Sequence, residues 1–423
     1  MNFDTLLKGM DCTCGKHHSC DIGFIAVENN AVKHLTSLCK DYKNILIVAD
    51  ENTYKAGGEK AEAYIKDKNI DRVIFSGDTV LIPNEEAIDK IREKTADTDL
   101  IVGIGSGVIQ DLCKYVSFFD KIPYYIVATA PSMDGYASTV AAMILRGMKV
   151  SYITKVPEAI IADTSIIKNA PLDMIKSGYG DVIGKYSALN DWKLSNLLFG
   201  EKLCEYIYNL TRDMLLATVP LADKLLSRDE ESIKTLTEAL IGVGIAMAYQ
   251  ENSRPASGSE HHISHFFELN GIRKGTYYFP HGTDVAYSTV ISCAVREKLL
   301  NADFNCKRFV MSDEEYISGI TDAYGETANE CIELQKKSGN YTADRIPLYL
   351  AKEKEIKEVL SEIPTAKEME ELLCKIGLDM QKFYDTYDNK TINKAVLFAK
   401  DLRDRFTALW MYYDIFGTER IVL

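Results

Sequence analysis

The chain has 423 residues, of which 46% are apolar and 26% are charged, and its formal net charge is −13. This length exceeds the usual limit for one hydrophobic core, so we expect two domains, and the composition is that of a globular protein. The acidic balance argues against a nucleic-acid partner, because binding to a phosphate backbone depends on clustered Lys and Arg.

The N-terminal segment MNFDTLLKGMDC lacks the basic and apolar regions of an export signal. No run of about 18 uninterrupted apolar residues occurs in the sequence, and the ten cysteines are few for this length. We therefore expect a cytoplasmic protein without membrane insertion.

The segment CTCGKHHSC at residues 12–20 contains five side chains that bind zinc in other proteins: Cys12, Cys14, His17, His18 and Cys20. Its Cys-x-Cys pair is closer than the gap of about two to four residues in typical structural zinc sites, and no second pair follows at zinc-finger spacing. The sequence therefore favours an exposed N-terminal strand or loop over a structural zinc site.

From about residue 44 to residue 167, β-rich runs alternate with helical patterns. The predicted strands are residues 44–50, 71–77, 99–107, 122–132 and 159–163, and the predicted helices are residues 55–69, 85–96 and 108–119. This alternation predicts a parallel sheet with helices on both faces. Two strand-like runs in residues 141–154 predict a β-hairpin with its turn at Arg146 and Gly147.

After Pro171 the sequence changes to long amphipathic patterns, such as residues 201–226 and 235–253. We therefore expect a Rossmann-like α/β nucleotide-binding domain over residues 1–165 and an all-helical domain over residues 166–423. The sequence contains no internal repeat and no long linker.

The segment LIVGIGSGVIQD at residues 100–111 passes from a hydrophobic strand through Gly103, Gly105 and Gly107 into a helix that begins near Val108. Glycines let the backbone turn sharply and approach a ligand, and the N–H groups at a helix start attract phosphate oxygens. The context favours binding of an anion or a dinucleotide over a merely tight turn.

Asp50 ends the predicted strand 44–50. Its carboxylate could accept hydrogen bonds from ribose hydroxyls or cap the helix that follows, and the sequence leaves both roles open. The segment ATAPSMDGYAS adds Thr129, Ser132, Asp134 and Ser138 in a polar loop on the same sheet edge. Such loop residues are functional more often than core strand residues are.

Asp181 lies in an apolar helical neighbourhood, with Lys185 one turn later. One interpretation is an ion pair between these two residues. The other is a metal site in which Asp181 joins two histidines, one of them His281, in a set suited to Zn²⁺, Ni²⁺ or Fe²⁺ with open positions for substrate. Such a site supports transfer of hydride between a nicotinamide and a carbonyl.

The segment SGSEHHISHFFE contains three of the seven histidines, His261, His262 and His265. On a helix, His265 shares a face with His261 at i,i+4 and almost as well with His262 at i,i+3. Spacing alone does not decide which of them binds a metal.

Five motifs in this order and spacing resemble those of the sn-glycerol-1-phosphate dehydrogenases, in particular the bacterial AraM-type branch. They are GIGSGVIQD, ATAPSMDGYAS, GYGDVIGKYSALNDWKLS, NSRPASGSEHHISHFFE and FPHGTDVA. The resemblance covers about residues 40–290 and continues in LRDRFTALW at residues 402–410. It implies the fold shared with glycerol dehydrogenases, iron-containing alcohol dehydrogenases and dehydroquinate synthases, in which a nucleotide-binding domain precedes a helical metal domain.

The resemblance also implies interconversion of dihydroxyacetone phosphate and sn-glycerol 1-phosphate, a reaction of phospholipid biosynthesis, with NAD(H) or NADP(H) and one divalent metal ion, Zn²⁺ or Ni²⁺. We expect a homodimer or a higher homo-oligomer acting on a phosphorylated small molecule. The alternatives are another metal-dependent glycerol or polyol dehydrogenase of the same superfamily, or a dehydroquinate-synthase-like lyase.

By position, the resemblance implies that Asp50 binds the adenosine ribose and that Asp134 binds substrate. It assigns the metal to Asp181, His261 and His281, with Asp181 and His265 as substrate-binding and catalytic residues, whereas His262 points about 100° away from His261. Lys185 and helix N-termini are the expected phosphate donors. The remaining cofactor-binding residues implied by the resemblance are Gly105, Ser106, Gly107, Val108, Ile109, Gln110, Asp111, Thr129, Ala130, Pro131, Ser132 and Ser138.

Overall fold

The structure is a computed structural model that describes residues 1–145 and 148–421, and the chain divides into two compact units. The first unit comprises residues 1–182 and 216–252, and the second comprises residues 183–215 and 253–423. The predicted hairpin turn at Arg146 and Gly147 lies outside the described residues. Each unit is described separately below.

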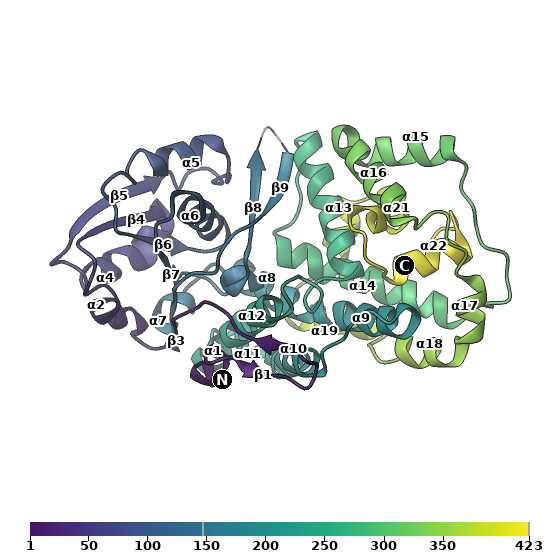
Figure 1. Cartoon of the computed structure of the whole chain (residues 1–423), viewed down its shortest axis with the longest axis horizontal. Helices are drawn as coiled ribbons and strands as arrows, with labels where there is room; N and C mark the ends of the chain where they lie inside the picture. Colours follow the sequence, from purple (N-terminus) through teal and green to yellow (C-terminus); the bar gives the residue numbers. More distant parts are fainter. Residues whose placement is uncertain (146–147, 422–423) are drawn as a thin grey trace. The chain divides into compact units, whose positions relative to one another are not determined.

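A six-stranded sheet forms the core of the first unit (Figure 1). Its order is β3-β10-β7-β6-β4-β5, and all neighbouring strands are parallel. The strands are β3 (Phe24–Glu28), β4 (Asn44–Asp50), β5 (Asn69–Phe75), β6 (Leu100–Gly105), β7 (Tyr124–Ala128) and β10 (Ala159–Asp163). The predicted parallel sheet is therefore confirmed, and β3 is an additional edge strand that the sequence patterns did not indicate.

Alternate residues of the central strand β4 face two separate hydrophobic clusters. Ile45 and Ile47 join one cluster, whereas Leu46 and Val48 join the other. Successive side chains of a strand point to opposite faces, so burial on both faces explains why this segment reads as a continuous apolar run. The helices of this unit are α1 (Phe3–Leu7), α2 (Leu35–Leu38), α3 (Glu51–Thr53), α4 (Glu59–Glu62), α5 (Glu85–Arg92), α6 (Gly107–Asp120), α7 (Thr164–Ile167), α8 (Leu172–Ile183), α11 (Ala222–Leu226) and α12 (Glu230–Gln250).

The segment that was predicted as one helix over residues 55–69 is broken into short pieces. A π-helical turn, Tyr54–Gly58, separates α3 from α4, which ends at Glu62. Gly57 in this turn lies against α7, since a Cβ atom there would be 3.1 Å from Ile166 Cδ1. The predicted single helix is therefore wrong. The helical pattern did not reveal the close packing at Gly57, where the regular helix is interrupted.

Two antiparallel hairpins complete the first unit. The predicted hairpin forms from β8 (Val140–Leu145) and β9 (Met148–Ile153). The second consists of β1 (Met10–Asp11) and β2 (His17–His18), at the N-terminal cysteine and histidine cluster.

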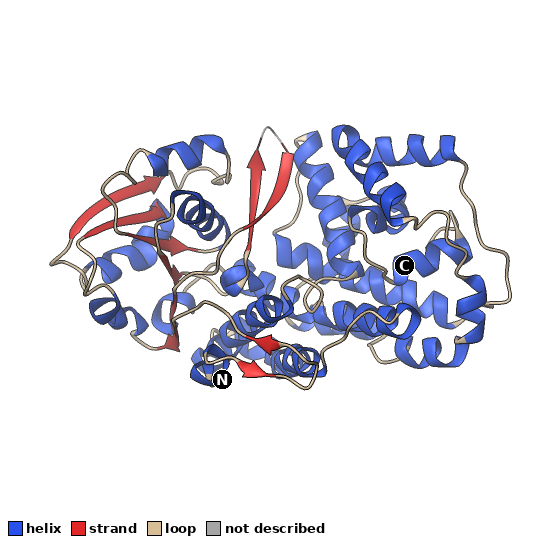
Figure 2. Cartoon of the chain, viewed as in Figure 1, coloured by secondary structure: helices blue, strands red, loops and turns tan. Residues whose placement is uncertain are grey.

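The second unit is helical, as expected, and its described residues contain no strand (Figure 2). Helix α14 is buried along most of its length, as a central helix is. The helices are α9 (Lys185–Phe199), α13 (Ser259–Lys274), α14 (His281–Leu300), α15 (Asp313–Tyr324), α16 (Ala328–Ser338), α17 (Ile346–Ala351), α18 (Glu353–Leu360), α19 (Ala366–Lys375), α20 (Met380–Thr386), α21 (Asn389–Phe398) and α22 (Ala408–Phe416), while α10 (Glu205–Thr218) runs from this unit into the first. Among the described helices of the whole chain, none has the length and apolar character needed to cross a bilayer.

Candidate active site

The sheet of the first unit contains a topological switch point between β4 and β6. The chain leaves β4 toward β5 on one side, whereas it leaves β6 toward β7 on the other. The helices that follow also lie on opposite faces, because Ala61 of α4 and Leu112 of α6 belong to different hydrophobic clusters. Open α/β sheets bind ligands at the carboxyl ends of the strands that flank such a point, and here those ends are Asp50 and Gly105.

The turn from β6 into α6 is built for close backbone approach. At Gly105 a Cβ atom would lie 2.6 Å from the Ile109 Cβ, so glycine allows the helix to start directly against the strand. At Gly107 a Cβ atom would meet nothing closer than Met133 Cγ at 3.8 Å, and Ser106 makes no capping hydrogen bond to the helix. The start of α6 is therefore uncrowded at Gly107, as the predicted anion-binding turn requires.

Asp50 caps the helix after β4. Its Oδ1 accepts a hydrogen bond from the Thr53 N–H at 2.9 Å, and the Asp50 N–H donates to Thr53 Oγ1 at 3.0 Å. The capping role that the sequence left open is thus present. A ribose would have to use the second carboxylate oxygen, Oδ2.

The loop of residues 129–138 follows β7 and is held by side chains from α6 and α8. Gln110 donates to the carbonyls of Gly135 and Tyr136 at 3.1 and 2.8 Å, and the Ser177 hydroxyl donates to the Ser132 carbonyl at 3.1 Å. The Gln110 side chain therefore anchors the loop. The side chain of the adjacent Ile109 packs in the hydrophobic core, so the side chains of these two predicted cofactor residues both serve to hold the structure together.

Two glycines bring helices unusually close to this loop. At Gly178 of α8 a Cβ atom would lie 1.8 Å from the Pro131 carbonyl oxygen, and at Gly244 of α12 it would lie 2.8 Å from the Asp134 carbonyl oxygen. Both contacts are backbone to backbone, so rotation of a side chain cannot relieve them. The 129–138 loop is therefore shaped by helices that come much later in the sequence than the sheet.

Asp181 also contacts this loop. Its Oδ2 accepts a hydrogen bond from the Asp134 N–H at 3.0 Å, and both side chains are buried. Asp134 begins the 3₁₀ turn Asp134–Ala137, so the carboxylate of Asp181 fixes the start of that turn. The structure thus brings two of the predicted substrate residues together.

Three predicted histidines converge in the second unit. The ring centroid of His281, the first residue of α14, lies 5.2 Å from that of His261 and 5.6 Å from that of His265. The two rings on α13, His261 and His265, have centroids 5.9 Å apart. The three rings are therefore close neighbours, as a shared ligand would require.

His262 is not part of this group. It is buried, and among the described residues neither of its ring nitrogens has a hydrogen-bond partner. Burial, together with the positive charges of Arg405, Arg403 and Arg254, lowers the pKa of His262 well below its usual value. Its burial and its position outside the group of three rings are consistent with a packing role.

Glu260 is a residue that sequence reasoning missed. Its Oε1 accepts hydrogen bonds from His261 Nδ1 at 2.7 Å and from the Gly258 N–H at 2.9 Å. Burial alone raises the pKa of Glu260, but hydrogen bonds from His261, Ser187 and Gly258 outweigh it and lower the pKa below its usual value. Because Nδ1 of His261 is hydrogen-bonded to this carboxylate, the lone pair of its other ring nitrogen, Nε2, can bind a metal ion. This is the usual arrangement around ligating histidines.

The start of α13 is fixed by Asp191 of α9. Asp191 Oδ2 accepts hydrogen bonds from the N–H and hydroxyl of Ser259, and Oδ1 accepts one from the Ala408 N–H at 2.8 Å. The Arg405 guanidinium donates to the Ser257 carbonyl at 3.0 Å. The motif at residues 402–410 therefore holds the histidine helix in position.

A second set of ligand atoms overlaps the first. His265, Glu268 and His281 each offer one atom, and these atoms lie within 4.8 Å of one another. Glu268 was not predicted, although its position one turn after His265 is the signal that could have indicated it.

Comparisons with known proteins agree with this architecture. Residues 26–171 match the family model described as iron-containing alcohol dehydrogenase. A glycerol-1-phosphate dehydrogenase of Halalkalibacterium halodurans, named with NAD(P)+ as its cofactor, is 33% identical over 67% of this chain and 73% of its own length. One from Bacillus licheniformis is 27% identical over 94% of this chain and 90% of its own.

Among solved structures, an iron-containing alcohol dehydrogenase from Thermococcus thioreducens matches 94% of this chain and 98% of its own, with a TM-score of 0.61 and 18% identity. This likeness confirms the predicted fold. The sequence relatives identify the family within this fold. The chain belongs to the glycerol-1-phosphate dehydrogenase family, within the iron-containing alcohol dehydrogenases.

Proposed function

We propose that the protein interconverts dihydroxyacetone phosphate and sn-glycerol 1-phosphate with NAD(H) or NADP(H) and a divalent metal ion. The observation that carries this proposal is the match to named glycerol-1-phosphate dehydrogenases over most of both chains. The chemistry of the side chains supports it, since a glycine-rich strand-to-helix turn, a buried carboxylate and a group of histidines are all present.

Asp181, His261 and His281 would hold the metal. Each offers one ligand atom, and these atoms lie within 4.8 Å of one another. One carboxylate and two imidazoles suit Zn²⁺ or Ni²⁺ and leave coordination positions open. When bound, the ion acts as a Lewis acid on the oxygen of the substrate.

The cofactor would bind at the switch point of the sheet, in the predicted nucleotide-binding domain of residues 1–165. The turn at Gly105 and Gly107 would hold the pyrophosphate, Asp50 would bind the adenosine ribose, and the 129–138 loop would hold the nicotinamide, which supplies or accepts hydride when bound. The negative charge of Asp50 would disfavour the 2′-phosphate of NADP(H), so we expect NAD(H) to bind more tightly.

The side chains around the histidines would orient the substrate and move a proton. His265 is half-buried and stacks on His281 with an interplanar angle of 23°, so it is placed to contact substrate beside the metal ligands. We assign proton transfer at the substrate oxygen to this imidazole. The buried ammonium of Lys185, at the start of α9, is our candidate for the substrate phosphate.

The proposal is tested with a substrate panel and with metal content. Purified protein should oxidise NAD(P)H with dihydroxyacetone phosphate far faster than with dihydroxyacetone, and the product should be sn-glycerol 1-phosphate in a chiral assay. Equal rates with the two ketones would point instead to a general polyol dehydrogenase. Turnover of a cyclic substrate without net change in NADH absorbance would point to a lyase like dehydroquinate synthase.

Variants separate the two overlapping ligand sets. His261→Ala and Asp181→Asn should lose bound metal, measured by mass spectrometry, whereas Glu268→Gln should keep it. His265→Ala should keep metal while losing turnover. The opposite pattern, with metal lost in Glu268→Gln and retained in His261→Ala, would assign the ion to the second set.

We further propose that the protein acts in the cytoplasm as a homodimer or higher homo-oligomer.

A further inference from the structure

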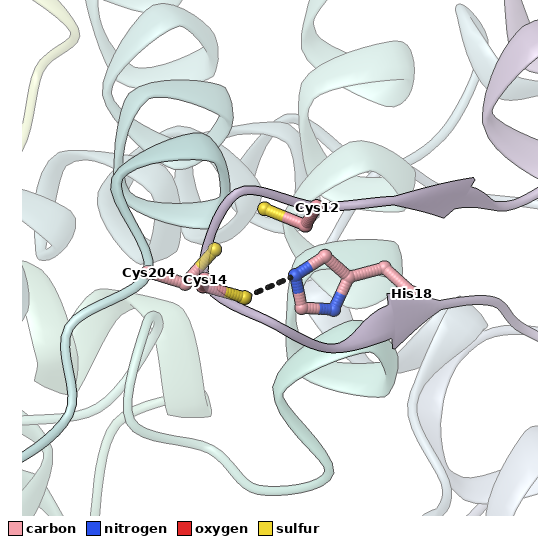
Figure 3. A group of neighbouring side chains, drawn as sticks. All are labelled: Cys12, Cys14, His18 and Cys204. Atoms are coloured by element: carbon pink, nitrogen blue, oxygen red, sulfur yellow. Dashed lines mark hydrogen bonds between the residues drawn. The ribbon is translucent and has the colours of Figure 1, made fainter.

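The N-terminal hairpin gathers three metal-binding side chains. Residues 12–16 form the turn between β1 and β2, closed by hydrogen bonds from the Cys12 N–H to the Lys16 carbonyl at 3.0 Å and from the Gly15 N–H to the Cys12 carbonyl at 2.9 Å. Gly15 has a φ of +86°, which favours glycine. Cys14 Sγ lies 3.3 Å from His18 Nε2 (Figure 3).

A fourth ligand comes from a distant part of the sequence. Cys204 immediately precedes α10 and is buried. One ligand atom each from Cys12, Cys14, His18 and Cys204 lies within 4.8 Å of the other three, and the sticks in Figure 3 point toward a common centre.

We propose that Cys12, Cys14, His18 and Cys204 bind a structural zinc ion, separate from the metal of the proposed active site. Three thiolates and one imidazole form a closed set of the kind that holds structural zinc. With Zn–S near 2.3 Å and Zn–N near 2.0 Å, the ligand atoms of a tetrahedral site are about 3.5–3.8 Å apart. The four atoms are thus close to their bound positions before any metal enters.

The surroundings of His18 support a fixed ligand. The ring is buried and stacks on Tyr249 with centroids 5.5 Å apart and an interplanar angle of 16°, and the Tyr249 hydroxyl donates to the Leu6 carbonyl. A hairpin of two-residue strands is marginal on its own. Zinc would stabilise this short hairpin, because binding energy at a site absent from the unfolded chain is folding energy.

The nearby cysteine supplies a matched control. Cys20 lies two residues after His18, is partly buried like Cys12, and is not in the ligand group. In the full-length protein, Cys14→Ser and Cys204→Ser should each bind one zinc ion per chain fewer than wild type, measured by mass spectrometry. Cys20→Ser should bind as much zinc as wild type. Asp181→Asn should lose the other metal and keep this one, so the two sites fail independently.

Cobalt exchange tests the site without a mutation. Full-length wild-type protein loaded with Co²⁺ should show intense near-ultraviolet thiolate-to-cobalt absorption, and this band should disappear in Cys14→Ser and persist in Asp181→Asn. A wild-type spectrum without this band would overturn the proposal. So would zinc content that is unchanged in both cysteine variants, or a Cys12–Cys14 or Cys14–Cys204 disulfide in protein purified under reducing conditions.

Discussion

Gly178→Ala tests the contact between α8 and the 129–138 loop. The new Cβ atom would lie 1.8 Å from the Pro131 carbonyl oxygen, and ordinary contacts begin at 3.4 Å, so helix and loop must separate by about 1.6 Å. Leu240 Cδ1 at 3.1 Å closes another direction of escape. Overpacking usually destabilises by about 1–3 kcal/mol, and because the obstacle is backbone we expect a loss of about 3 kcal/mol.

Two measurements report this change. In a cooperative unit of about 200 residues, 1 kcal/mol shifts the melting temperature by about 2–4 °C, so circular dichroism should show a fall of about 6–12 °C. A displacement of about an ångström at a reacting group lowers the rate by about 100-fold. We therefore expect a comparable loss in kcat/KM, accompanied by weaker binding of NADH in a fluorescence titration.

Gly107→Ala is the matched control. Its Cβ atom would meet nothing closer than 3.8 Å, so the melting temperature should stay within about 1 °C of wild type. NADH binding should still weaken, because the methyl group occupies space at the helix start that the pyrophosphate needs. Unchanged melting and unchanged NADH affinity in Gly178→Ala would refute the close approach on which this reasoning rests.

Three further predictions concern other polar contacts. Burial raises the pKa of Asp163, but hydrogen bonds from Ser165 and Lys60 lower it below its usual value. The Asp163 carboxylate therefore stabilises the fold above the unfolded-state pKa, about 3.9, and this stabilisation is lost as the pH falls through the lower folded-state pKa. Asp163→Asn should lower the free energy of unfolding, measured with urea, more at pH 7 than at pH 3. Glu260→Gln should weaken metal binding by about 10–100-fold in competition with a chelator while the melting temperature of the metal-free protein changes little, and equal affinity would exclude the orienting role. Lys400→Met leaves the buried Asp401, 2.8 Å away, without its cation and should destabilise by about 3–5 kcal/mol, whereas the double variant with Asp401→Asn should recover much of this loss in urea unfolding.

Much of the sheet was predictable because its strands are buried on both faces. The pattern at residues 44–50 coincides with β4, and that at residues 159–163 coincides with β10. The edge strand Phe24–Glu28 was missed because five residues beside a cysteine-rich segment carry little periodic signal. The broken helix after β4 depends on packing of Gly57 against Ile166, a contact that local periodicity does not encode.

The candidate site divides in the same way. The glycine turn was visible because its signal is local, and the resemblance selected His261 where spacing could not. Glu260 was missed because neighbouring residues on a helix normally point about 100° apart. Here the two neighbours Glu260 and His261 lie in the first turn of α13, and their side chains are hydrogen-bonded. The sequence gives no sign that Cys204 lies near the N-terminal hairpin, because nothing near position 204 indicates a segment almost two hundred residues earlier.

The clamps at Gly178 and Gly244 have a consequence for the order of folding. All six strands of the sheet have been synthesised once the chain reaches Asp163, yet α12, which presses on the start of the 3₁₀ turn, ends only at Gln250. When a nascent chain has emerged from the ribosome as far as β10, all strands of the sheet are available, but the helices that fix the 129–138 loop are not. The final form of the proposed nicotinamide pocket is therefore acquired late in synthesis, and an excised α/β fragment of residues 1–165 should bind NADH poorly even when its sheet is folded.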